Sequence, residues 1–250
     1  MTPRIIILDV EEEFDRAAAD WLCARLERPG EVVLGLATGS SPVGLYRELV
    51  RRYREGAISF ARARTFNLDE YVGLGADHPQ SYARFMRERL FDHVDMDLER
   101  AHIPDGKAAD PEAEARRYEA LLQRFGPIDA QILGIGTNGH IGFNEPGTPF
   151  SARTHVVTLA EETRRSNARF FASIDEVPRQ AITMGIANIL EAREILLLAR
   201  GEAKAEALAK AFCEPPTPAV PASALQNHSS VTLLLDRAAA KGLEPLLAAR

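Results

Sequence analysis

Short runs of β-branched and aliphatic residues alternate along this chain with longer stretches of helical periodicity. This alternation constrains the fold strongly, because strands joined through helices usually run parallel and are covered by helices. It predicts an α/β fold with a mostly parallel central sheet. The expected strands are residues 4–8, 32–37, 64–68, 130–135, 155–159, 181–184, 194–199 and 231–235. The expected helices are residues 12–28, 43–54, 80–91, 112–125, 161–171, 201–212 and 237–247.

Chain length and the absence of a linker indicate the domain organisation. With 250 residues, of which 46% are apolar and 26% charged, the chain is long enough for one well-buried core. The proline-rich stretch 215–221 lies between an expected helix and the last expected strand, so we interpret it as a rigid loop. We therefore expect a single domain over residues 1–250.

The charge balance and the cysteine content restrict the partners and the compartment. A formal net charge of −6 provides no general attraction for nucleic acid or for an anionic membrane, so we expect neither partner, and any anionic ligand needs a local site. The apolar run 5–8 is too short for a signal peptide, and no charge-free run approaches the length of a bilayer span. Cys23 and Cys213 cannot build a disulfide framework or a cysteine metal site, so a reducing cytoplasm is the simplest location.

A small, hydroxyl-rich turn follows the expected strand 32–37 and precedes a helix. It consists of Thr38, Gly39, Ser40 and Ser41. Backbone N–H groups in such a turn, together with the helix dipole, favour a negative group, so the turn is a candidate phosphate site. It is not a nucleotide P-loop, because the closing Gly-Lys-Ser/Thr is missing. The alternative is an ordinary helix N-cap by one of the two serines.

An acidic pair, Asp69 and Glu70, follows the expected strand 64–68. Ligands of open parallel sheets bind at the carboxyl ends of the strands, so an acid in this position can meet a substrate. Asp69 is therefore a candidate general base. A solvated loop acid is the alternative, whereas Asp69 lies too early in the chain to cap the helix expected near Pro79.

The glycine-rich stretch 134–147 carries His140 together with Asn138 and Glu145. Its first three glycines have the G-x-G-x-x-G spacing of a dinucleotide site, but further glycines and Pro146 disfavour the helix that such a site requires. An imidazole held by a carboxylate is the usual arrangement for proton transfer near neutral pH. A structural histidine in a glycine-rich turn is the alternative.

These three motifs together resemble the glucosamine-6-phosphate deaminase family. The resemblance rests on residues 38–42, 67–71 and 138–146, and it continues in colinear order through 151–155, 163–171, 178–185 and 201–204. It implies a Rossmann-like three-layer αβα fold. It also implies a reaction without metal or cofactor, in which glucosamine 6-phosphate is isomerised and deaminated to fructose 6-phosphate and ammonia.

The resemblance also implies roles for individual residues. Asp69 matches the acid that moves a proton from C2 to C1 of the opened sugar. His140 matches the ring-opening base, which Glu145 and Asn138 support. The implied phosphate ligands are Thr38, Gly39, Ser40, Ser41, Arg169 and Lys204. Arg165 lies one helical turn before Arg169, and the resemblance favours Arg169 as the ligand.

Two departures from the family pattern bear on basicity and on regulation. Some members carry an acid where Asn138 stands, so this chain lacks a second carboxylate there. Members that are activated by N-acetylglucosamine 6-phosphate place basic residues where His155 and Val157 stand, so we expect no such activation. Whether residues 161–175 move as a lid, and whether the chain forms a homo-oligomer, stays open.

Two rival functions share parts of this pattern. The first is 6-phosphogluconolactonase, which we disfavour because residues 143–146 and 67–71 match the deaminase. The second is a sugar-phosphate-sensing regulatory domain, which would keep the phosphate turn and discard proton transfer. No helix-turn-helix precedes residue 32, which argues against the second.

Overall fold

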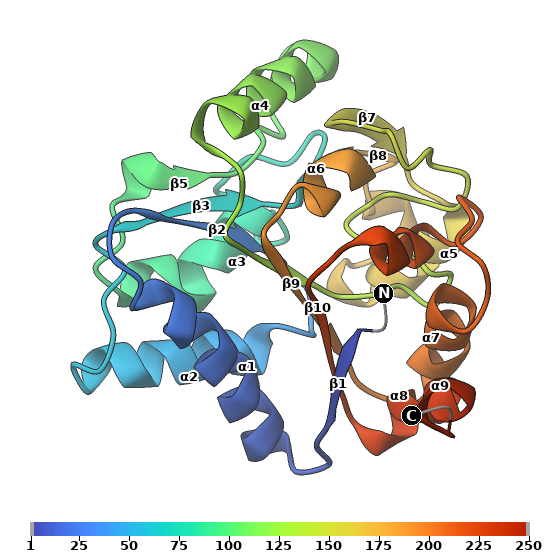
Figure 1. Ribbon diagram of the computed structural model, residues 1–250. Coiled ribbons are helices and arrows are strands. Elements are labelled where there is room, and N and C mark those ends of the chain that lie inside the picture. Colours follow the sequence, from blue (N-terminus) through green and yellow to red (C-terminus); the bar gives the residue numbers. More distant parts are fainter. Residues whose placement is uncertain (1–2, 249–250) are drawn as a thin grey trace.

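Seven parallel strands form the central sheet within residues 3–248, the part of the chain that the computed structural model describes (Figure 1). The four terminal residues of the expected domain lie outside the described residues. In spatial order the strands are β1 (Arg4–Ile7), β10 (Val231–Leu235), β9 (Glu194–Ala199), β6 (Ala130–Leu133), β2 (Val32–Leu36), β3 (Ala63–Asn67) and β5 (Ala101–His102). Every pairing between neighbours in this sheet is parallel, which confirms the α/β fold class.

Helices cover both faces of the sheet and complete three layers (Figure 1). One layer contains α1 (Glu11–Leu26), α2 (Val43–Arg54) and α3 (Tyr82–Arg89). The opposite layer contains α4 (Pro111–Phe125), α6 (Ile186–Leu190) and α7 (Ala205–Phe212). The remaining α-helices are α5 (Glu161–Asn167), α8 (Arg237–Ala240) and α9 (Glu244–Ala248). The 3-10 helices are Phe91–His93, Leu98–Arg100, Ala168–Phe170, Ile174–Glu176, Glu202–Lys204, Pro221–Asn227 and Lys241–Leu243.

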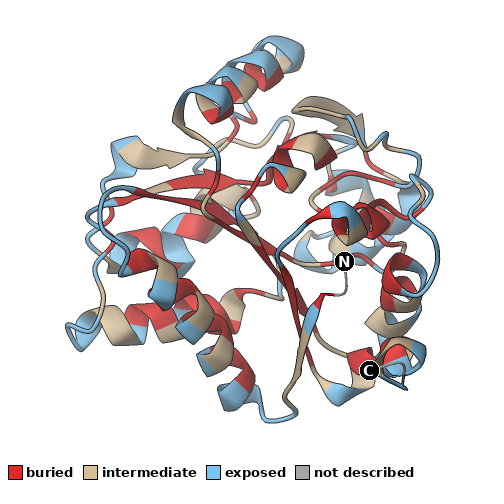
Figure 2. Ribbon diagram, viewed as in Figure 1, coloured by how far each residue is buried: buried red, intermediate tan, exposed pale blue. Residues whose placement is uncertain are grey.

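Burial explains why the central strands are almost entirely apolar. All residues of β2, β6 and β10 are buried, and Figure 2 shows these strands buried beneath helices whose outer faces are exposed. A strand that is covered on both faces reads as a continuous apolar run rather than as an alternating one. Each large aliphatic side chain buried here contributes about 1.5–3 kcal/mol relative to exposure.

A second, antiparallel sheet stands apart from the central one. It contains β4 (Asp69–Tyr71), β8 (Gln180–Thr183) and β7 (His155–Thr158), with β8 in the middle. The strands expected at 155–159 and 181–184 exist, but they belong to this sheet. Residues 69–71 were expected as a loop, and that expectation was wrong. Strand β4 is too short to show a period, and acidic residues are depleted in strands, so its sequence carried no strand signal.

Several helix boundaries differ from the expected ones for local reasons. The helix expected at 161–171 leaves α geometry after Asn167 and continues as a 3-10 turn. Gly201 has φ +88°, so the helix expected from residue 201 begins with a 3-10 turn and becomes α only at Ala205. The helix expected at 237–247 is three short helices in succession. The five-residue α6 had no detectable period.

The strand order creates a switch point between β2 and β6. From β2 the chain builds outward through β3 to β5, and from β6 it builds in the opposite direction through β9 to β10. Loops that leave neighbouring strands at such a point diverge and open a crevice at their carboxyl ends. Within residues 3–248 every helix is too short or too polar to cross a membrane.

Candidate active site

A cavity of about 530 Å³ lies at the carboxyl ends of the central strands. The loops that follow β2, β3, β6 and β9 line it, together with α3, α5 and the 3-10 turn after α5. Nine of the ten predicted site residues line this one cavity: Thr38, Gly39, Ser40, Ser41, Asp69, Asn138, His140, Arg169 and Lys204. The tenth, Glu145, is buried and contacts Asn138 and His140. This volume suits a small organic ligand such as a sugar phosphate.

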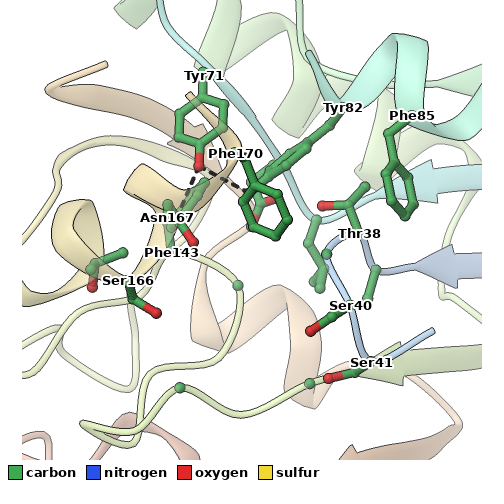
Figure 3. A pocket seen from close by; sticks show the side chains of 18 of the residues that line it. Thr38, Ser40, Ser41, Tyr71, Tyr82, Phe85, Phe143, Ser166, Asn167 and Phe170 are labelled. Atoms are coloured by element: carbon green, nitrogen blue, oxygen red, sulfur yellow. Dashed lines mark hydrogen bonds between the residues drawn. The ribbon is translucent and has the colours of Figure 1, made fainter. Parts of the chain in front are cut away.

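The turn after β2 leaves its hydroxyl groups available to a ligand. The N-cap of α2 is Pro42, and no side chain in the described chain caps this helix, so the alternative of a serine N-cap is wrong. Gly39 has φ +84°, a conformation that other residues adopt only with strain. Ser40 and Ser41 lie across the cavity from Tyr71 and Asn167 (Figure 3). Free N–H groups at a helix start and unpaired hydroxyls are suited to phosphate oxygens.

Two cations without a carboxylate partner in the described chain line the same cavity as this turn. Lys204 ends the 3-10 helix after β9, Arg169 lies in the 3-10 turn after α5, and neither forms an ion pair in the described part of the chain. Burial, followed by the charge of Arg169, lowers the pKa of Lys204. Arg165 instead pairs with Glu161 at 3.4 Å and does not line the cavity. An anion that binds between Lys204 and Arg169 relieves their mutual repulsion.

Asp69 is held in the first position of β4, opposite Thr183 of β8. Its side chain is buried in the cavity wall, and the backbone N–H of Phe143 donates a hydrogen bond to its carboxylate. Burial raises the pKa of Asp69 to about 8, and the neighbouring Glu70 charge acts in the same direction. A carboxylate with few hydrogen bonds and a raised pKa is a stronger base than one in water.

Glu70 has a different task although it is adjacent in sequence. Its carboxylate accepts hydrogen bonds from the backbone N–H groups of Tyr71, Tyr82 and Ala83 at 2.8, 3.0 and 2.8 Å. The last two belong to the first turn of α3, so Glu70 satisfies orphan donors at the start of that helix. Burial raises the pKa of Glu70 to about 7, while these three hydrogen bonds act against the rise. Glu70 is therefore a structural carboxylate.

His140 occupies space that the glycines of its loop create. A Cβ atom on Gly136 would lie 2.3 Å from Cε1 of the imidazole, so a side chain at that position would displace the ring. After β6 the next helix in the described chain is α5, which begins 28 residues after Leu133 (161 minus 133), so the loop lacks the helix of a dinucleotide site. The rejection of a dinucleotide site is thus supported by the fold.

A buried carboxylate supports the imidazole. The Nδ1 atom of His140 lies 3.8 Å from Oε2 of Glu145, and the Asn138 amide donates to the same oxygen at 3.0 Å. The other oxygen of Glu145 accepts from the backbone N–H of Ala160 at 3.1 Å. Burial lowers the pKa of His140, Glu145 raises it, Lys204 lowers it and Glu162 raises it, with burial the largest effect. His140 is therefore neutral at pH 7 and able to accept a proton.

The structure adds an aromatic and amide network that the sequence did not indicate. The Asn167 amide donates to the Tyr71 hydroxyl at 2.9 Å, and the Tyr82 hydroxyl donates to it at 3.3 Å (Figure 3). Phe143 stacks on Tyr82 with ring centroids 6.0 Å apart. This network joins α5 to β4 directly beside Asp69. The only signal for it was the position of Tyr71 two residues after Asp69.

Metal-binding clusters are absent from the described residues: no group of three or more His, Cys, Asp or Glu side chains is placed to hold an ion. Cys23 is buried, Cys213 is exposed, and both are free thiols.

Comparison with known proteins relates this site to one family. The family model for glucosamine-6-phosphate isomerases and 6-phosphogluconolactonase matches residues 9–234. The chain is 55% identical over 226 residues to the glucosamine-6-phosphate deaminase of Geobacillus sp. (strain WCH70), which covers 90% of each protein. It is 52% identical over 240 residues to the enzyme of the same name from Rhodopirellula baltica, which covers 96% of each.

Solved structures agree with this relationship. A structure described as a monomeric glucosamine-6-phosphate deaminase superposes with a TM-score of 0.93 at 50% identity, covering 95% of this chain and 98% of the other. The 6-phosphogluconolactonase of Trypanosoma brucei superposes with a TM-score of 0.78 at 21% identity, covering 97% and 99%, a likeness that concerns the fold alone. This chain belongs to the family of glucosamine-6-phosphate isomerases and 6-phosphogluconolactonases.

Proposed function

We propose that the protein converts glucosamine 6-phosphate and water to fructose 6-phosphate and ammonia. The observation that carries the proposal is one cavity that holds a buried acid, Asp69, a neutral imidazole, His140, and two unpaired cations, Lys204 and Arg169. Relatives that are 52–55% identical over at least 90% of the chain bear the corresponding name. The reaction uses no metal and no cofactor in this proposal.

Ring opening is the first step and falls to His140. The neutral imidazole accepts the proton of the anomeric hydroxyl and returns a proton to the ring oxygen, which yields the open-chain aldehyde. Glu145 stabilises the imidazolium that forms in between, because its carboxylate lies 3.8 Å from Nδ1. Asn138 fixes the carboxylate through its 3.0 Å hydrogen bond.

Proton transfer at carbon is the second step and falls to Asp69. The carboxylate removes the proton from C2, the electron pair moves toward the C1 carbonyl, the substrate ammonium group gives one proton to the C1 oxygen, and an enolamine forms. Return of the proton to C1 gives an imine at C2, which water hydrolyses to the ketone and ammonia. The substrate ammonium group at C2 favours the ionised carboxylate and so lowers the raised pKa of Asp69 on binding.

Phosphate binding holds the sugar in register for both steps. Lys204, Arg169 and the turn 38–41 supply charge and N–H donors at a point remote from C1 and C2. Binding energy from a non-reacting group fixes the orientation of the reacting carbons, so it accelerates the chemistry as well as strengthening binding.

Two assays separate the proposed reaction from its nearest rival. The parent protein is incubated with glucosamine 6-phosphate, and ammonia is measured with a coupled dehydrogenase; hydrolysis of 6-phosphogluconolactone is measured in parallel. We expect ammonia release and no lactone hydrolysis above the spontaneous rate. Lactone hydrolysis without ammonia release would assign the chain to the other branch of its family, and activity in neither assay would favour a sensing domain.

We further propose that residues 1–250 act as one domain and that residues 161–175 form a lid over the cavity. Support for the lid comes from its contacts across the cavity, which include the Asn167–Tyr71 and Thr137–Glu162 hydrogen bonds and the edge-on packing of Phe171 on Tyr71. A segment held by few contacts opens at low cost.

A further inference from the structure

The basicity of His140 depends on more than the carboxylate in its own loop. Asn138 carries no charge, so Glu145, at 3.8 Å from Nδ1, is the carboxylate that the loop itself brings to the ring. A second carboxylate reaches the same cavity wall from α5: Glu162 lines the cavity with His140. The proposed reaction assigns no task to this residue.

Glu162 is tied to the histidine loop by a specific hydrogen bond. The Thr137 hydroxyl donates to Oε1 of Glu162 at 3.0 Å. Thr137 belongs to a closed turn, because the Gly136 N–H donates to the His140 carbonyl at 2.9 Å. The carboxylate is therefore fixed against the segment that carries the imidazole. Its neighbour Glu161 is turned away and pairs with Arg164 at 3.2 Å and Arg165 at 3.4 Å.

We propose that Glu162 is a positioning residue for His140: through its hydrogen bond with Thr137 it docks α5 on the histidine loop and holds a carboxylate in the cavity that the imidazole lines. The proposal rests on the proposed function, in which His140 opens the sugar ring.

The charged groups around the imidazole determine the sign of the effect. Glu145 follows in the same loop, Lys204 approaches from the 3-10 helix after β9, and Glu162 approaches from α5. Asp69 and Arg169 are further charged groups that line the same cavity. Burial and Lys204 lower the pKa of His140, and the two glutamates raise it, so loss of either glutamate charge must lower it further. Because Glu162 is exposed, solvent and salt screen the effect of its charge on the pKa of His140.

The matched variants are Glu162→Gln and Glu161→Gln. Each removes one negative charge from α5, but only Glu162 lines the cavity, and a glutamine there still accepts the Thr137 hydrogen bond. The pKa of His140 is read from the NMR shift of its Cε1–H group, assigned by its loss in His140→Gln. We expect Glu162→Gln to lower this pKa by roughly 0.2–0.7 unit at low salt, with a smaller shift in 1 M NaCl. We expect no shift in Glu161→Gln.

Kinetics and rescue give an independent readout. With glucosamine 6-phosphate, the acid limb of kcat/KM is set by Asp69, whose pKa of about 8 lies above that of His140. The readout is therefore the plateau rate, which should fall by up to about five-fold in Glu162→Gln because a weaker base abstracts more slowly. Asn138→Asp in the Glu162→Gln background places a carboxylate beside the ring by another route. It should return the pKa of His140 toward the parent value.

An unchanged pKa of His140 in Glu162→Gln overturns the proposal, as does an equal shift in Glu161→Gln. The NMR titration requires no turnover. If the parent protein releases no ammonia, the proposed function fails while this titration still decides what Glu162 does.

Discussion

Asp69 and Glu70 are adjacent, both are buried, and burial raises both pKa values, to about 8 and about 7. Their hydrogen bonds distinguish them. Glu70 accepts from three backbone N–H groups, two of them in the first turn of α3, whereas Asp69 accepts from the N–H of Phe143. A carboxylate whose lone pairs accept hydrogen bonds from the backbone has a structural role. One that keeps free lone pairs in a cavity can accept a proton from a substrate.

We predict that Asp69→Asn abolishes turnover and stabilises the fold. The amide cannot accept a proton from C2, so kcat should fall by about 10²–10⁴-fold with little change in KM. The folded pKa of about 8 lies above the ordinary value of 3.8, so the folded state favours the protonated acid. The stability associated with that proton is present below pH 4 and is lost as pH rises toward 8. Thermal melts at pH 5 and pH 8 should show that the unfolding free energy of the variant, relative to that of the parent, rises by a few kcal/mol between the two pH values. This is the size that the raised pKa implies.

Glu70→Gln is the matched control for this prediction. It also removes a charge whose pKa burial raises, but it weakens three hydrogen bonds, so its stability relative to the parent at pH 8 should be about 1–3 kcal/mol less favourable than that of Asp69→Asn. If Asp69→Asn still exchanges the C2 hydrogen with solvent at the parent rate, Asp69 is not the base.

We predict that Arg169→Ala and Lys204→Ala each weaken substrate binding through the phosphate. Loss of one charge-assisted hydrogen bond costs about 1.5–3 kcal/mol, so KM for glucosamine 6-phosphate should rise by roughly 10- to 150-fold. Arg165→Ala is the control, because Arg165 lies one turn away, pairs with Glu161 and does not line the cavity. Equal losses with phosphorylated and unphosphorylated substrate would mean that these side chains do not contact phosphate.

Helices and strands differed in how well their own residues predicted their presence. Buried strands such as β2 and β10 are apolar almost throughout, and α4 presents Ala115, Tyr118 and Leu122 at helical spacing, so both kinds were predictable. β4 and α6 were not, because three and five residues show no period. The same limit applies to the site: Asp69 and His140 stand in recognisable motifs, whereas the partners of Tyr71 come from α3 and α5 and meet only in the fold.

We predict that Asn167→Ala loosens α5 and the turn that follows it. The variant loses the 2.9 Å hydrogen bond to the Tyr71 hydroxyl, worth about 0.5–1.5 kcal/mol. Hydrogen exchange of residues 161–171 should accelerate several-fold, and KM should rise because Arg169 lies in this segment. Ser166→Ala is the control, since Ser166 also lines the cavity but makes no side-chain hydrogen bond in the described chain. If Tyr71→Phe and Asn167→Ala have additive effects on exchange, the hydrogen bond does not hold α5.

The whole molecule brings distant motifs together because of its strand order. The hydroxyl-rich turn 38–41 follows β2, the acid follows β3, the histidine loop follows β6 and Lys204 follows β9, and these four strands are neighbours in the order β9-β6-β2-β3. Parallel strands all end at one edge of the sheet, so motifs separated by more than 100 residues converge there. This convergence could be predicted from the alternation of strands and helices in the sequence. The antiparallel sheet that carries Asp69 could not, and only the structure revealed it.

At this scale the last prediction concerns regulation: N-acetylglucosamine 6-phosphate should not activate the protein. Activation requires a second site whose ligand binds one conformation better than another, and a phosphorylated effector needs cations or free N–H groups to supply that difference. His155 instead donates its Nδ1–H to the Arg153 carbonyl at 2.8 Å, and Val157 packs against the cluster formed by Tyr71, Phe143, Leu159 and Ala181.

Arg153, two residues before His155, is already neutralised, because it pairs with Glu119 at 2.8 Å and with Glu191. Positions 155 and 157 therefore offer an effector phosphate no lysine or arginine, and the coupling free energy should fall well below the roughly 1–3 kcal/mol of a typical allosteric effector. Steady-state curves with glucosamine 6-phosphate should be hyperbolic, and saturating N-acetylglucosamine 6-phosphate should leave half-saturation unchanged apart from weak competition at the cavity. The double variant His155→Arg/Val157→Lys supplies the missing charges. Comparing its response to N-acetylglucosamine 6-phosphate with that of the parent shows whether charge alone is enough for activation. A several-fold decrease of half-saturation in the parent protein, with loss of sigmoidicity, would contradict the prediction, because it requires an effector site built from other groups.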